Sequence, residues 1–557
     1  MKKIIYILTF VAAIMSSGCT DFLSETNKSN PDAAAFYKTT SGYESLINSC
    51  YSSLRDVYGD NIEMFVAGTD LFKIGRAGLV SQGLGSYQNL TPADNSVKAF
   101  YQIVYQSIKR CNDAIYYGQL NNHSATKIAE MRFLRAFYYF HLVQQFGDVS
   151  LVTDHITTPI TDYPRTPASD VYAFIISEMK AALAGLPATD IANRINKRVV
   201  NHYLSLVYLT KGYETFGVST DFDSTVVYST AAIKGQALSL PFDGKTGIFY
   251  PGLEKNAEII FSAQYSAASL ESVTKGNSQA YYYGAYLGGA DGAVNDGMPY
   301  MNTRLKSTMR LYNLLSADAN DKRFAGTFMQ ELYGVCKTGK CSYYSYFKKF
   351  DTRTTLEVLM YYPKPGAVQA DVDAWKALNV AQRDSAVIKW PTTTTGGVTV
   401  NNWEKNDLDK DYPCIKKFSD PDAPFNTTGS RRDIFLARLA ETYLIRAEAY
   451  IKLAKLTEAK TDINVVRTRA GAASIVEANA TIDYILDERA REFAGEYNRW
   501  YDLKRTGKLV QYVSTYNPDV PSDANMKGND GKYKILRPIP QDALGLNTAG
   551  VAQNPGY

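Results

Sequence analysis

The sequence predicts a mainly α-helical protein, in which a tetratricopeptide-like helical-repeat superhelix carries an irregular, partly β insertion. In residues 36–240 and again in 431–512, apolar residues recur at steps of three and four, which is the period of a packed helix. Residues 241–430 lack this period and are rich in Gly, Thr, Asn and Tyr. We expect residues 513–557 to pack back on the helical scaffold.

The N-terminal helical part, residues 36–240, contains helices that are apolar around most of their girth. In AEMRFLRAFYYFHLVQQFGDV (129–149), Leu134 and Tyr138 follow the helical step, and aromatic residues fill the positions beside them. Such a helix has to be covered on more than one side. The next helix, SDVYAFIISEMKAALAGLP (169–187), ends in Gly and Pro, which stop helices.

The insertion, residues 241–430, contains strand signals and is the expected ligand-binding part of the chain. NAEIIFSAQYS (256–266) predicts a buried strand, while CSYYSYFKKF (341–350) and GGVTVNNWEK (396–405) predict strand-rich or irregular pieces. The stretch DVDAWKAL predicts an amphipathic helix with Trp375 on its buried side.

Two adjacent helices are predicted in the C-terminal helical part. RDIFLARLAETYLIRAEAYIKL (432–453) has one apolar stripe, and its alanines allow a neighbouring helix to approach closely. KLTEAKTDINVVRTRAG (455–471) forms the second helix, which Gly471 ends. Paired helices with small and aromatic residues at matching offsets are typical of tetratricopeptide-like repeats, which stack into a superhelix.

Residues 1–18 have the pattern of a secretory signal peptide. Lys2 and Lys3 precede an almost wholly apolar run from Ile4 to Met15, and small residues follow that run. The run is shorter than the about 20 apolar residues that span a bilayer. We therefore expect the segment to be cleaved rather than retained as an anchor.

Cys19 directly follows the small residues, and the segment resembles a bacterial lipoprotein box, with Ser16 where the usual box carries Leu. We expect cleavage before Cys19 and acylation of its sulfur. Two or more acyl chains would hold the protein stably at a membrane. Residues 19–35 are polar with one proline and predict a short tether. An ordinary signal peptide that leaves Cys19 unmodified is the alternative.

The composition is that of a globular protein. Of the 557 residues, 45% are hydrophobic and 21% are charged, and the formal charge of +4 falls to +2 without Lys2 and Lys3. A nearly neutral chain excludes nucleic acid as the implied partner. Tyrosine is abundant, with 42 residues against 24 Phe and 4 Trp. It suits both cores with wet edges and ligand surfaces, and composition alone does not separate these uses.

Five cysteines remain besides Cys19. Cys336 and Cys341 enclose the turn-like tetrapeptide KTGK, so a disulfide across a hairpin and a pair of free thiols are both open for an exported protein. The other three stand in apolar patterns that predict small buried thiols: Cys50, Cys111 and Cys414.

The sequence contains no pattern for a metal, a cofactor or a catalytic nucleophile. The chain lacks HExxH spacing and a G-x-S-x-G elbow. The run DLDKDYPCIKKF begins like a calcium loop at Asp407, but Tyr412 replaces the required Gly and Phe418 the required Glu. We expect no metal and no cofactor. The scattered histidines are His123, His141, His155 and His202.

Glu488 and Glu492 raise the question of glycoside cleavage, which needs two carboxylates on either side of a sugar. They lie four residues apart in DERAREFAGEYNRWYDLKR, with arginines between them on one helical face. This pattern favours a structural salt-bridge network over an acid/base pair, and we expect no enzyme activity.

Five stretches together identify a family. They are RFLRAFYYFHLVQQFGDVSLV (132–152), LARLAETYLIRAEAYIKL (436–453), INVVRTRAG (463–471), ILDERAREFAGEYNRWYDLKRTGKL (485–509) and the ending LRPIPQDALGLN...QNPGY (536–557). In this order they resemble the SusD/RagB family, which comprises surface nutrient-binding lipoproteins of Bacteroidetes-type bacteria.

The resemblance implies a cell-surface, lipid-anchored protein of the outer membrane without catalytic activity. It implies a helical-repeat scaffold that sits as a lid on a SusC-like TonB-dependent barrel transporter. It also implies an oligosaccharide ligand, or a peptide in some members, which is captured for import. The leading hypothesis is therefore glycan capture and delivery to the transporter. The alternatives are a peptide-binding member, a glycoside hydrolase on a helical scaffold, and an assembly protein without a small ligand.

Two glycine-rich and tyrosine-rich stretches are the candidate ligand loops, because sugar sites combine aromatic platforms with polar partners on loops. The first is YYYGAYLGGADGAVNDGMPY (281–300), where alternation along an extended chain would turn at least Tyr282, or Tyr281 with Tyr283, outward. The second, FVAGTDLFKIGRAGLVSQGLGSY (65–87), lies where family loops often border the ligand. The candidate ligand contacts are Tyr281, Tyr282, Tyr283, Tyr286, Asn295 and Tyr300 from the first stretch and Asp70, Phe72, Arg76 and Tyr87 from the second.

Each of these aromatic residues has an alternative role, in which it fixes its loop onto the scaffold. The loops carry little charge, which favours a neutral glycan over a sulfated or uronic polymer.

Overall fold

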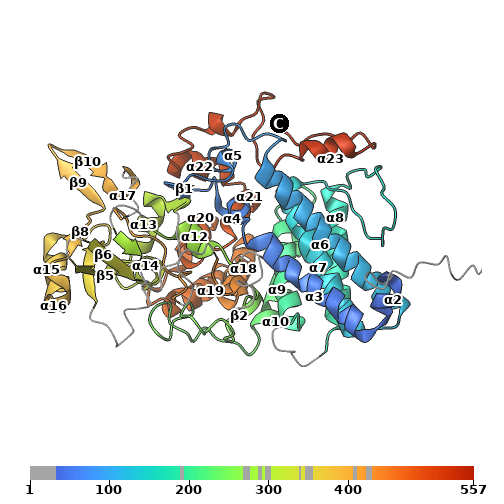
Figure 1. Ribbon diagram of the computed structural model, residues 1–557, viewed down its shortest axis with the longest axis horizontal. Helices are drawn as coiled ribbons and strands as arrows, with labels where there is room; N and C mark the ends of the chain where they lie inside the picture. Colours follow the sequence, from blue (N-terminus) through green and yellow to red (C-terminus); the bar gives the residue numbers. More distant parts are fainter. Residues whose placement is uncertain are drawn as a thin grey trace, which may run out of the picture.

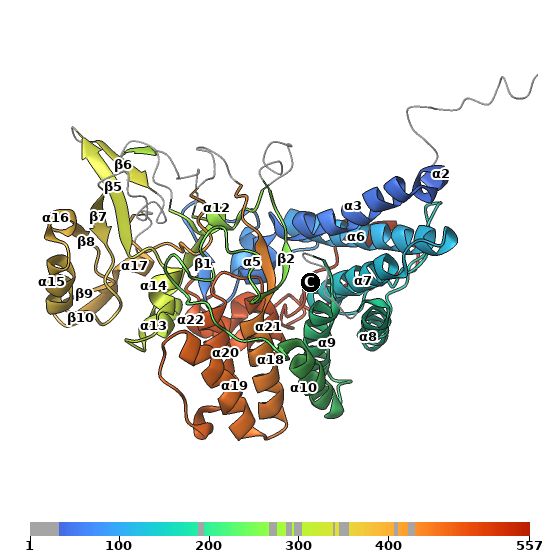
Figure 2. The same ribbon diagram turned by 90° about the horizontal axis from the view of Figure 1, so that it is seen from below.

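The computed structural model describes residues 33–187, 194–266, 276–285, 292–294, 303–337, 340–344, 356–405, 410–421 and 429–557, with the backbone alone for 292–294, 336–337 and 340–344. Helices dominate and strands are short, so the prediction of a mainly α fold is confirmed. Figures 1 and 2 show most of the N-terminal helices at one end, most strands of the insertion at the other, and most of the C-terminal helices between them. No helix in the described ranges is long and apolar enough to cross a membrane.

The N-terminal helices pack against one another in sequence order from α6 to α10, and α3 packs against α6. Side-chain oxygens of Thr39, Asp94 and Asn196 cap the first turns of α3, α6 and α9. Helix α7 is buried from Met131 to Phe146 except at Arg132, as its apolar girth predicts. The helices are α2 (Ala33–Lys38), α3 (Thr40–Tyr58), α4 (Ile62–Val66), α5 (Gln82–Ser86), α6 (Asn95–Leu120), α7 (Ala125–Phe146), α8 (Ala168–Gly185), α9 (Lys197–Lys211) and α10 (Thr220–Ile233).

The C-terminal helices continue this layer, because α18 packs against both α10 and α19. Gly471, with a φ of +74°, follows the end of α19, as its position in the sequence predicts. The tetratricopeptide-like superhelix and the part boundaries stay predictions. The helices are α18 (Leu439–Lys452), α19 (Leu456–Arg469), α20 (Ile482–Glu492), α21 (Arg499–Arg505), α22 (Leu509–Tyr516) and α23 (Gln541–Leu546).

The insertion leaves the helical scaffold between two paired strands, β2 (Ile259–Ala263) and β11 (Ile434–Arg438). They run antiparallel, with Ile434 opposite Ala263. The strand expected in 256–266 is therefore confirmed. Because β2 lies near the start of the insertion, β11 directly follows its end, and the two strands pair with each other, they close the insertion at its base.

The rest of the insertion consists of small sheets and short helices. A five-stranded sheet has the order β3-β6-β5-β7-β8, and β9 and β10 form a separate hairpin. Trp375 of α15 is buried and stacks on Tyr361 of β7 with ring centroids 3.8 Å apart, as predicted for its helix. The elements are α12 (Gln279–Tyr283), β3 (Gly292–Val294), β4 (Leu305–Ser307), α13 (Met309–Ser316), α14 (Arg323–Thr327), β5 (Glu331–Lys337), β6 (Lys340–Tyr344), β7 (Glu357–Tyr361), α15 (Gln369–Ala377), α16 (Val380–Arg383), β8 (Val387–Ile388), β9 (Thr392–Thr395), β10 (Val398–Asn401) and α17 (Asn402–Lys405).

A network of buried ion pairs connects α20 with its neighbours. Arg323 on α14 donates to Glu488 at 2.7 Å, and Arg438 on β11 donates to Glu492 at 2.9 Å. Both carboxylates are fully buried. Burial alone would raise the pKa of Glu492, but Arg469, Arg438 and Arg323 outweigh it and lower the pKa to about 2. The structural interpretation of Glu488 and Glu492 is confirmed, since both carboxylates face guanidinium groups in the interior.

We predict that Glu492→Gln lowers the free energy of unfolding at pH 7 by about 3–5 kcal/mol, because it leaves buried arginines without their partner. Since folding lowers the pKa of Glu492 from 4.5 to about 2, its contribution is present above pH 4.5 and is lost as the pH falls toward 2. Urea denaturation across this pH range should therefore be less pH-dependent in Glu492→Gln. Glu458→Gln on the exposed side of α19 is the control and should follow the wild type; equal behaviour of the two variants would contradict the prediction.

The structure confirms one of the two predictions for the cysteines and leaves the other untested. Cys50, Cys111 and Cys414 are buried and free, as expected. The β5–β6 hairpin places Cys336 directly opposite Cys341. Residues opposite each other in an antiparallel pair are about 4.5–5.5 Å apart at Cα, a separation that a disulfide can bridge. Their side chains lie outside the described ones, and the disulfide stays a prediction.

We predict that, after exposure to an oxidising compartment, Cys336 and Cys341 resist alkylation in denaturant until a reductant is added. Cys50, Cys111 and Cys414 should react in denaturant without a reductant, which makes them the internal control. Peptide mass spectrometry checks this. Full alkylation of all cysteines in denaturant alone would show that Cys336 and Cys341 are free thiols.

Candidate ligand-binding site

The described parts of the two candidate loop stretches come close together. Strand β1 (Phe72–Ile74), in the stretch 65–87, pairs antiparallel with β4 (Leu305–Ser307), which follows the stretch 281–300. The pairing continues beyond β1, because the Gly75 N–H donates to the Arg304 carbonyl at 2.8 Å. Segments more than 200 residues apart in sequence therefore meet at one place on the molecule.

A cleft of about 400 Å³ opens where these segments meet the N-terminal helices. Its wall comes from the turn before α4, the N-terminal turns of α6, and the region of α12 and β4. Hydroxyl, amide, carboxylate and guanidinium groups share the wall with aromatic and aliphatic side chains. The lining residues are Asp60, Asn61, Glu63, Met64, Val80, Asn95, Ser96, Ala99, Ser278, Tyr281, Tyr282 and Arg304.

Arg304 and two tyrosines form the cationic and aromatic side of the cleft. The guanidinium carbon of Arg304 lies 5.6 Å from the ring centre of Tyr281 and 5.8 Å from that of Tyr282. Arg304 also donates to the Gly78 carbonyl at 3.3 Å. Burial opposes its charge, but the Tyr281 hydroxyl and Glu63 together raise the pKa of Arg304. Arg304 therefore carries a fixed positive charge beside a half-buried aromatic ring.

The two carboxylates of the cleft are engaged by neighbouring groups. Glu63 is buried and accepts hydrogen bonds from the backbone N–H groups of Val80 at 2.8 Å and Ser81 at 3.0 Å. Burial raises the pKa of Glu63 above its ordinary value in spite of these donors. Asp60 accepts a hydrogen bond from the Ser278 hydroxyl. The carboxylates thus hold the wall in shape.

Four candidate contacts are buried, so the expectation that they face a ligand is wrong for this conformation. Asp70 is fully buried and binds Arg310 at 2.8 Å and Arg499 at 2.6 Å. Tyr87 is buried and donates to the Gly68 carbonyl at 2.9 Å. The remaining two are Phe72 and Tyr283, whose buried rings pack together at 5.1 Å.

The three successive tyrosines form the short helix α12. The alternation expected for an extended chain therefore does not apply to them. Helical geometry turns Tyr283 into the core and leaves Tyr281 half-buried at the cleft. Tyr282 lines the cleft but is only 4% exposed, and its hydroxyl donates to the Asp60 carbonyl at 3.4 Å. Of the three, Tyr281 is the one that lines the cleft and is not buried.

The remaining candidates divide between the surface and the part of the chain that is not described. Arg76 is exposed on the segment that pairs with Thr303 and Arg304, and it is not among the lining residues. Tyr286, Asn295 and Tyr300 lie outside the described residues.

Most residues of the polar wall carry no recognisable signal in the sequence. Arg304, Asp60 and Asn61 have no motif around them, although the turn YGDN between two helical patterns is a polar segment that could have drawn attention. Ser96 and Asn95 belong to the first turn of α6 and are indistinguishable in sequence from ordinary helix-start residues. Among the described residues, no group of three or more His, Cys, Asp or Glu side chains could hold a metal ion.

Comparison with known proteins gives the family. Residues 257–557 match the profile of the SusD family, and residues 21–209 match a family described as "Starch-binding associating with outer membrane". The "SusD-like protein P2" of Formosa agariphila is 26% identical over 591 aligned positions, which cover 100% of both chains.

Solved structures share the fold over almost the whole chain. A "Laminarin binding SusD-like protein" matches with a TM-score of 0.65 and 21% identity, covering 94% of this chain and 100% of that one. Surface glycan-binding protein A from Bacteroides thetaiotaomicron, in complex with laminarihexaose, matches with a TM-score of 0.65 and 18% identity, covering 93% and 100%. Because the SusD profile spans more than half of the sequence, this chain belongs to the SusD/RagB family.

Proposed function

We propose that the protein is a cell-surface glycan-binding lipoprotein that captures oligosaccharides in the cleft around Tyr281 and Arg304. The observation that carries this proposal is the composition of the cleft wall. A half-buried tyrosine ring, a fixed guanidinium and several hydroxyl and amide groups meet in one hollow of about 400 Å³. Sugars present flat C–H faces and rings of hydroxyl groups, and these are the two kinds of surface that such a wall binds.

The relatives support a glycan ligand. One matched family is described as starch-binding, one structural neighbour as laminarin-binding, and another was solved with laminarihexaose. A neutral glucan is therefore our first choice of ligand, and a peptide is the alternative within the same family.

We propose that the protein binds its ligand without cleaving it. In the described part of the cleft the carboxylates are Asp60 and Glu63. A glycosidase needs two carboxyl groups that reach the glycosidic oxygen and the anomeric carbon. Glu63 is instead held by two backbone donors, and Asp60 is held by Ser278. This arrangement supports binding over acid/base chemistry.

The proposed setting is the outer membrane. One matched family is described as associating with the outer membrane, which supports this location. Acylation of Cys19 would supply the anchor, and residues 19–35 the tether. Delivery of the glycan to a SusC-like TonB-dependent transporter completes the proposal, and it rests on family membership alone.

We predict that the protein binds laminarin or starch in calorimetry or affinity electrophoresis, and that Tyr281→Ala and Arg304→Met each weaken binding at least about tenfold, equivalent to ~1.4 kcal/mol. The reason is that each variant removes one side of the aromatic and cationic wall. Tyr116→Ala, near the other end of α6, removes a tyrosine that is 42% exposed outside the cleft and serves as the matched control.

Three outcomes would contradict parts of the proposal. Unchanged binding by folded Tyr281→Ala and Arg304→Met would move the site away from the cleft. Binding of peptides but of no glycan would select the peptide-binding alternative. Shortened oligosaccharides after incubation would identify a hydrolase.

A further inference from the structure

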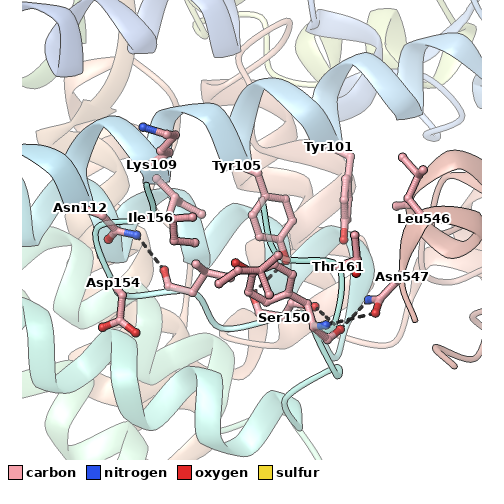
Figure 3. A pocket seen from close by; sticks show the side chains of 15 residues that line it. Tyr101, Tyr105, Lys109, Asn112, Ser150, Asp154, Ile156, Thr161, Leu546 and Asn547 are labelled. Carbon is pink, nitrogen blue, oxygen red and sulfur yellow. Dashed lines mark hydrogen bonds between the residues drawn. The ribbon is translucent and has the colours of Figure 1, made fainter. Parts of the chain in front are cut away.

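A second cavity of about 340 Å³ lies between α6, the segment 150–163 and α23 (Figure 3). Two tyrosines of α6, Tyr101 and Tyr105, stand next to each other in its wall, with ring centres 4.8 Å apart. Tyr163 enters from the segment, and aliphatic side chains such as Ile156 and Leu546 complete the lining. The cavity is thus an aromatic and aliphatic hollow with three walls from distant parts of the sequence.

Hydrogen bonds to the backbone hold these walls in place. Tyr105 donates to the Ser150 carbonyl at 3.0 Å, and the Asn112 amide donates to the Val152 carbonyl at 3.0 Å. Asn547 ties α23 to the segment, because its side-chain oxygen accepts from the Tyr163 N–H at 3.1 Å and its amide donates to the Tyr163 carbonyl. Since these groups are satisfied, the floor meets a ligand through ring faces and alkyl groups, and the cavity needs no rearrangement to form.

Polar groups without a partner stand at its mouth. In the part of the chain that the structure describes, the side chains of Asp154, Thr161 and Tyr163 take part in no hydrogen bond or ion pair, although all three line the cavity. Asp154 and Thr161 are exposed, so water hydrates them. Burial, and then the Asp154 carboxylate, raise the pKa of Tyr163, so its hydroxyl stays protonated and can donate. A flat ligand with an apolar face and hydroxyl groups on its edge matches such a floor and mouth.

Helix α6 separates this cavity from the cleft. Asn95, Ser96 and Ala99 line the cleft, whereas Tyr101 and Tyr105 line the cavity. Successive helical residues turn by about 100°, so Ala99 and Tyr101 point to nearly opposite sides of the helix. Ala99 and Tyr105 are separated by about 9 Å along the axis, and the helix with its side chains is about 10–12 Å across. One saccharide chain can therefore reach around α6 to both places.

We infer that this cavity is a second saccharide-binding site, which takes a pyranose unit of the glycan whose other units occupy the cleft. The inference rests on the proposed function, because it takes the cleft as the first site. Two weak sites on one chain raise the affinity for long glycans more than for short ones, because the second binding event is intramolecular.

Filling the cavity tests the inference. Ala543→Trp places a bulky ring into the cavity from α23, and Gln541→Trp adds the same ring to an exposed position of the same helix outside the lining. Both variants should melt at the wild-type temperature. We expect Ala543→Trp to weaken binding of laminarin or starch about tenfold, with little change for a disaccharide, and Gln541→Trp to bind like the wild type.

A direct measurement uses the variant Tyr281→Ala/Arg304→Met, in which the cleft is disabled. With ¹³C-labelled isoleucine methyl groups, laminarihexaose or maltohexaose should shift the NMR signals of Ile156 and Ile160, which line the cavity. Adding Ala543→Trp should abolish these shifts.

The outcomes separate the two proposals. A wild-type protein that binds no saccharide would overturn the proposed function and the second site with it. A wild type that binds through the cleft, with silent Ile156 and Ile160 signals and unchanged affinity in Ala543→Trp, would overturn the second site alone. A loss of transporter binding in Ala543→Trp with unchanged glycan affinity would also overturn it, since the cavity would then receive a side chain of a partner protein.

Discussion

The buried carboxylate of Asp70 is the ionic contact that joins the parts of the chain around the cleft. It receives Arg310 from α13 in the insertion and Arg499 from α21 in the C-terminal part, while Asp70 itself precedes β1 in the N-terminal part. Burial opposes the charge of Asp70, but the two arginines outweigh it and lower its pKa. One buried ion therefore joins three parts of the chain and holds β1 where β4 can pair with it. The cleft exists because that pairing brings Arg304 beside the first helices.

Much of the fold follows from local sequence, and the site does so only in part. The helical period predicts α7, α18 and α19, because each helix carries its own apolar face in consecutive residues. The helix predicted over 432–453 is wrong at its start, because Ile434–Arg438 form strand β11, which pairs with β2, and α18 begins only at Leu439. Asp70, by contrast, lies in a glycine-rich stretch that looks like a ligand loop, and its partners Arg310 and Arg499 are hundreds of residues away. No local pattern distinguishes a buried, paired aspartate from an exposed one. Arg304 could not be predicted for the same reason, because a single arginine forms no repeating pattern in the sequence.

The abundance of tyrosine has two explanations that the sequence left open, and the structure separates them. Many of the tyrosines act as core residues with one polar end: the hydroxyls of Tyr43, Tyr138 and Tyr203 donate to the backbone carbonyls of Ala114, Cys50 and Leu436. Each of these bonds ties one segment to a distant one while the ring fills the core. Others, including Tyr281 at the cleft, are only partly buried. The abundance of tyrosine therefore reflects in part how the scaffold is held together, and it does not by itself indicate a ligand surface.

The cleft draws its walls from two sources with different physical roles. Glu63 and the first turn of α6 belong to the helical scaffold, where backbone hydrogen bonds and helix packing hold them. Tyr281 and Arg304 belong to the insertion, which the β2–β11 pair closes at its base and Asp70 holds at its edge. A change of side chain at Tyr281 or Arg304 alters the binding wall without touching the buried ion pairs of α20. The helical scaffold thus provides one half of the cleft, and the aromatic and cationic groups of the cleft come from the insertion.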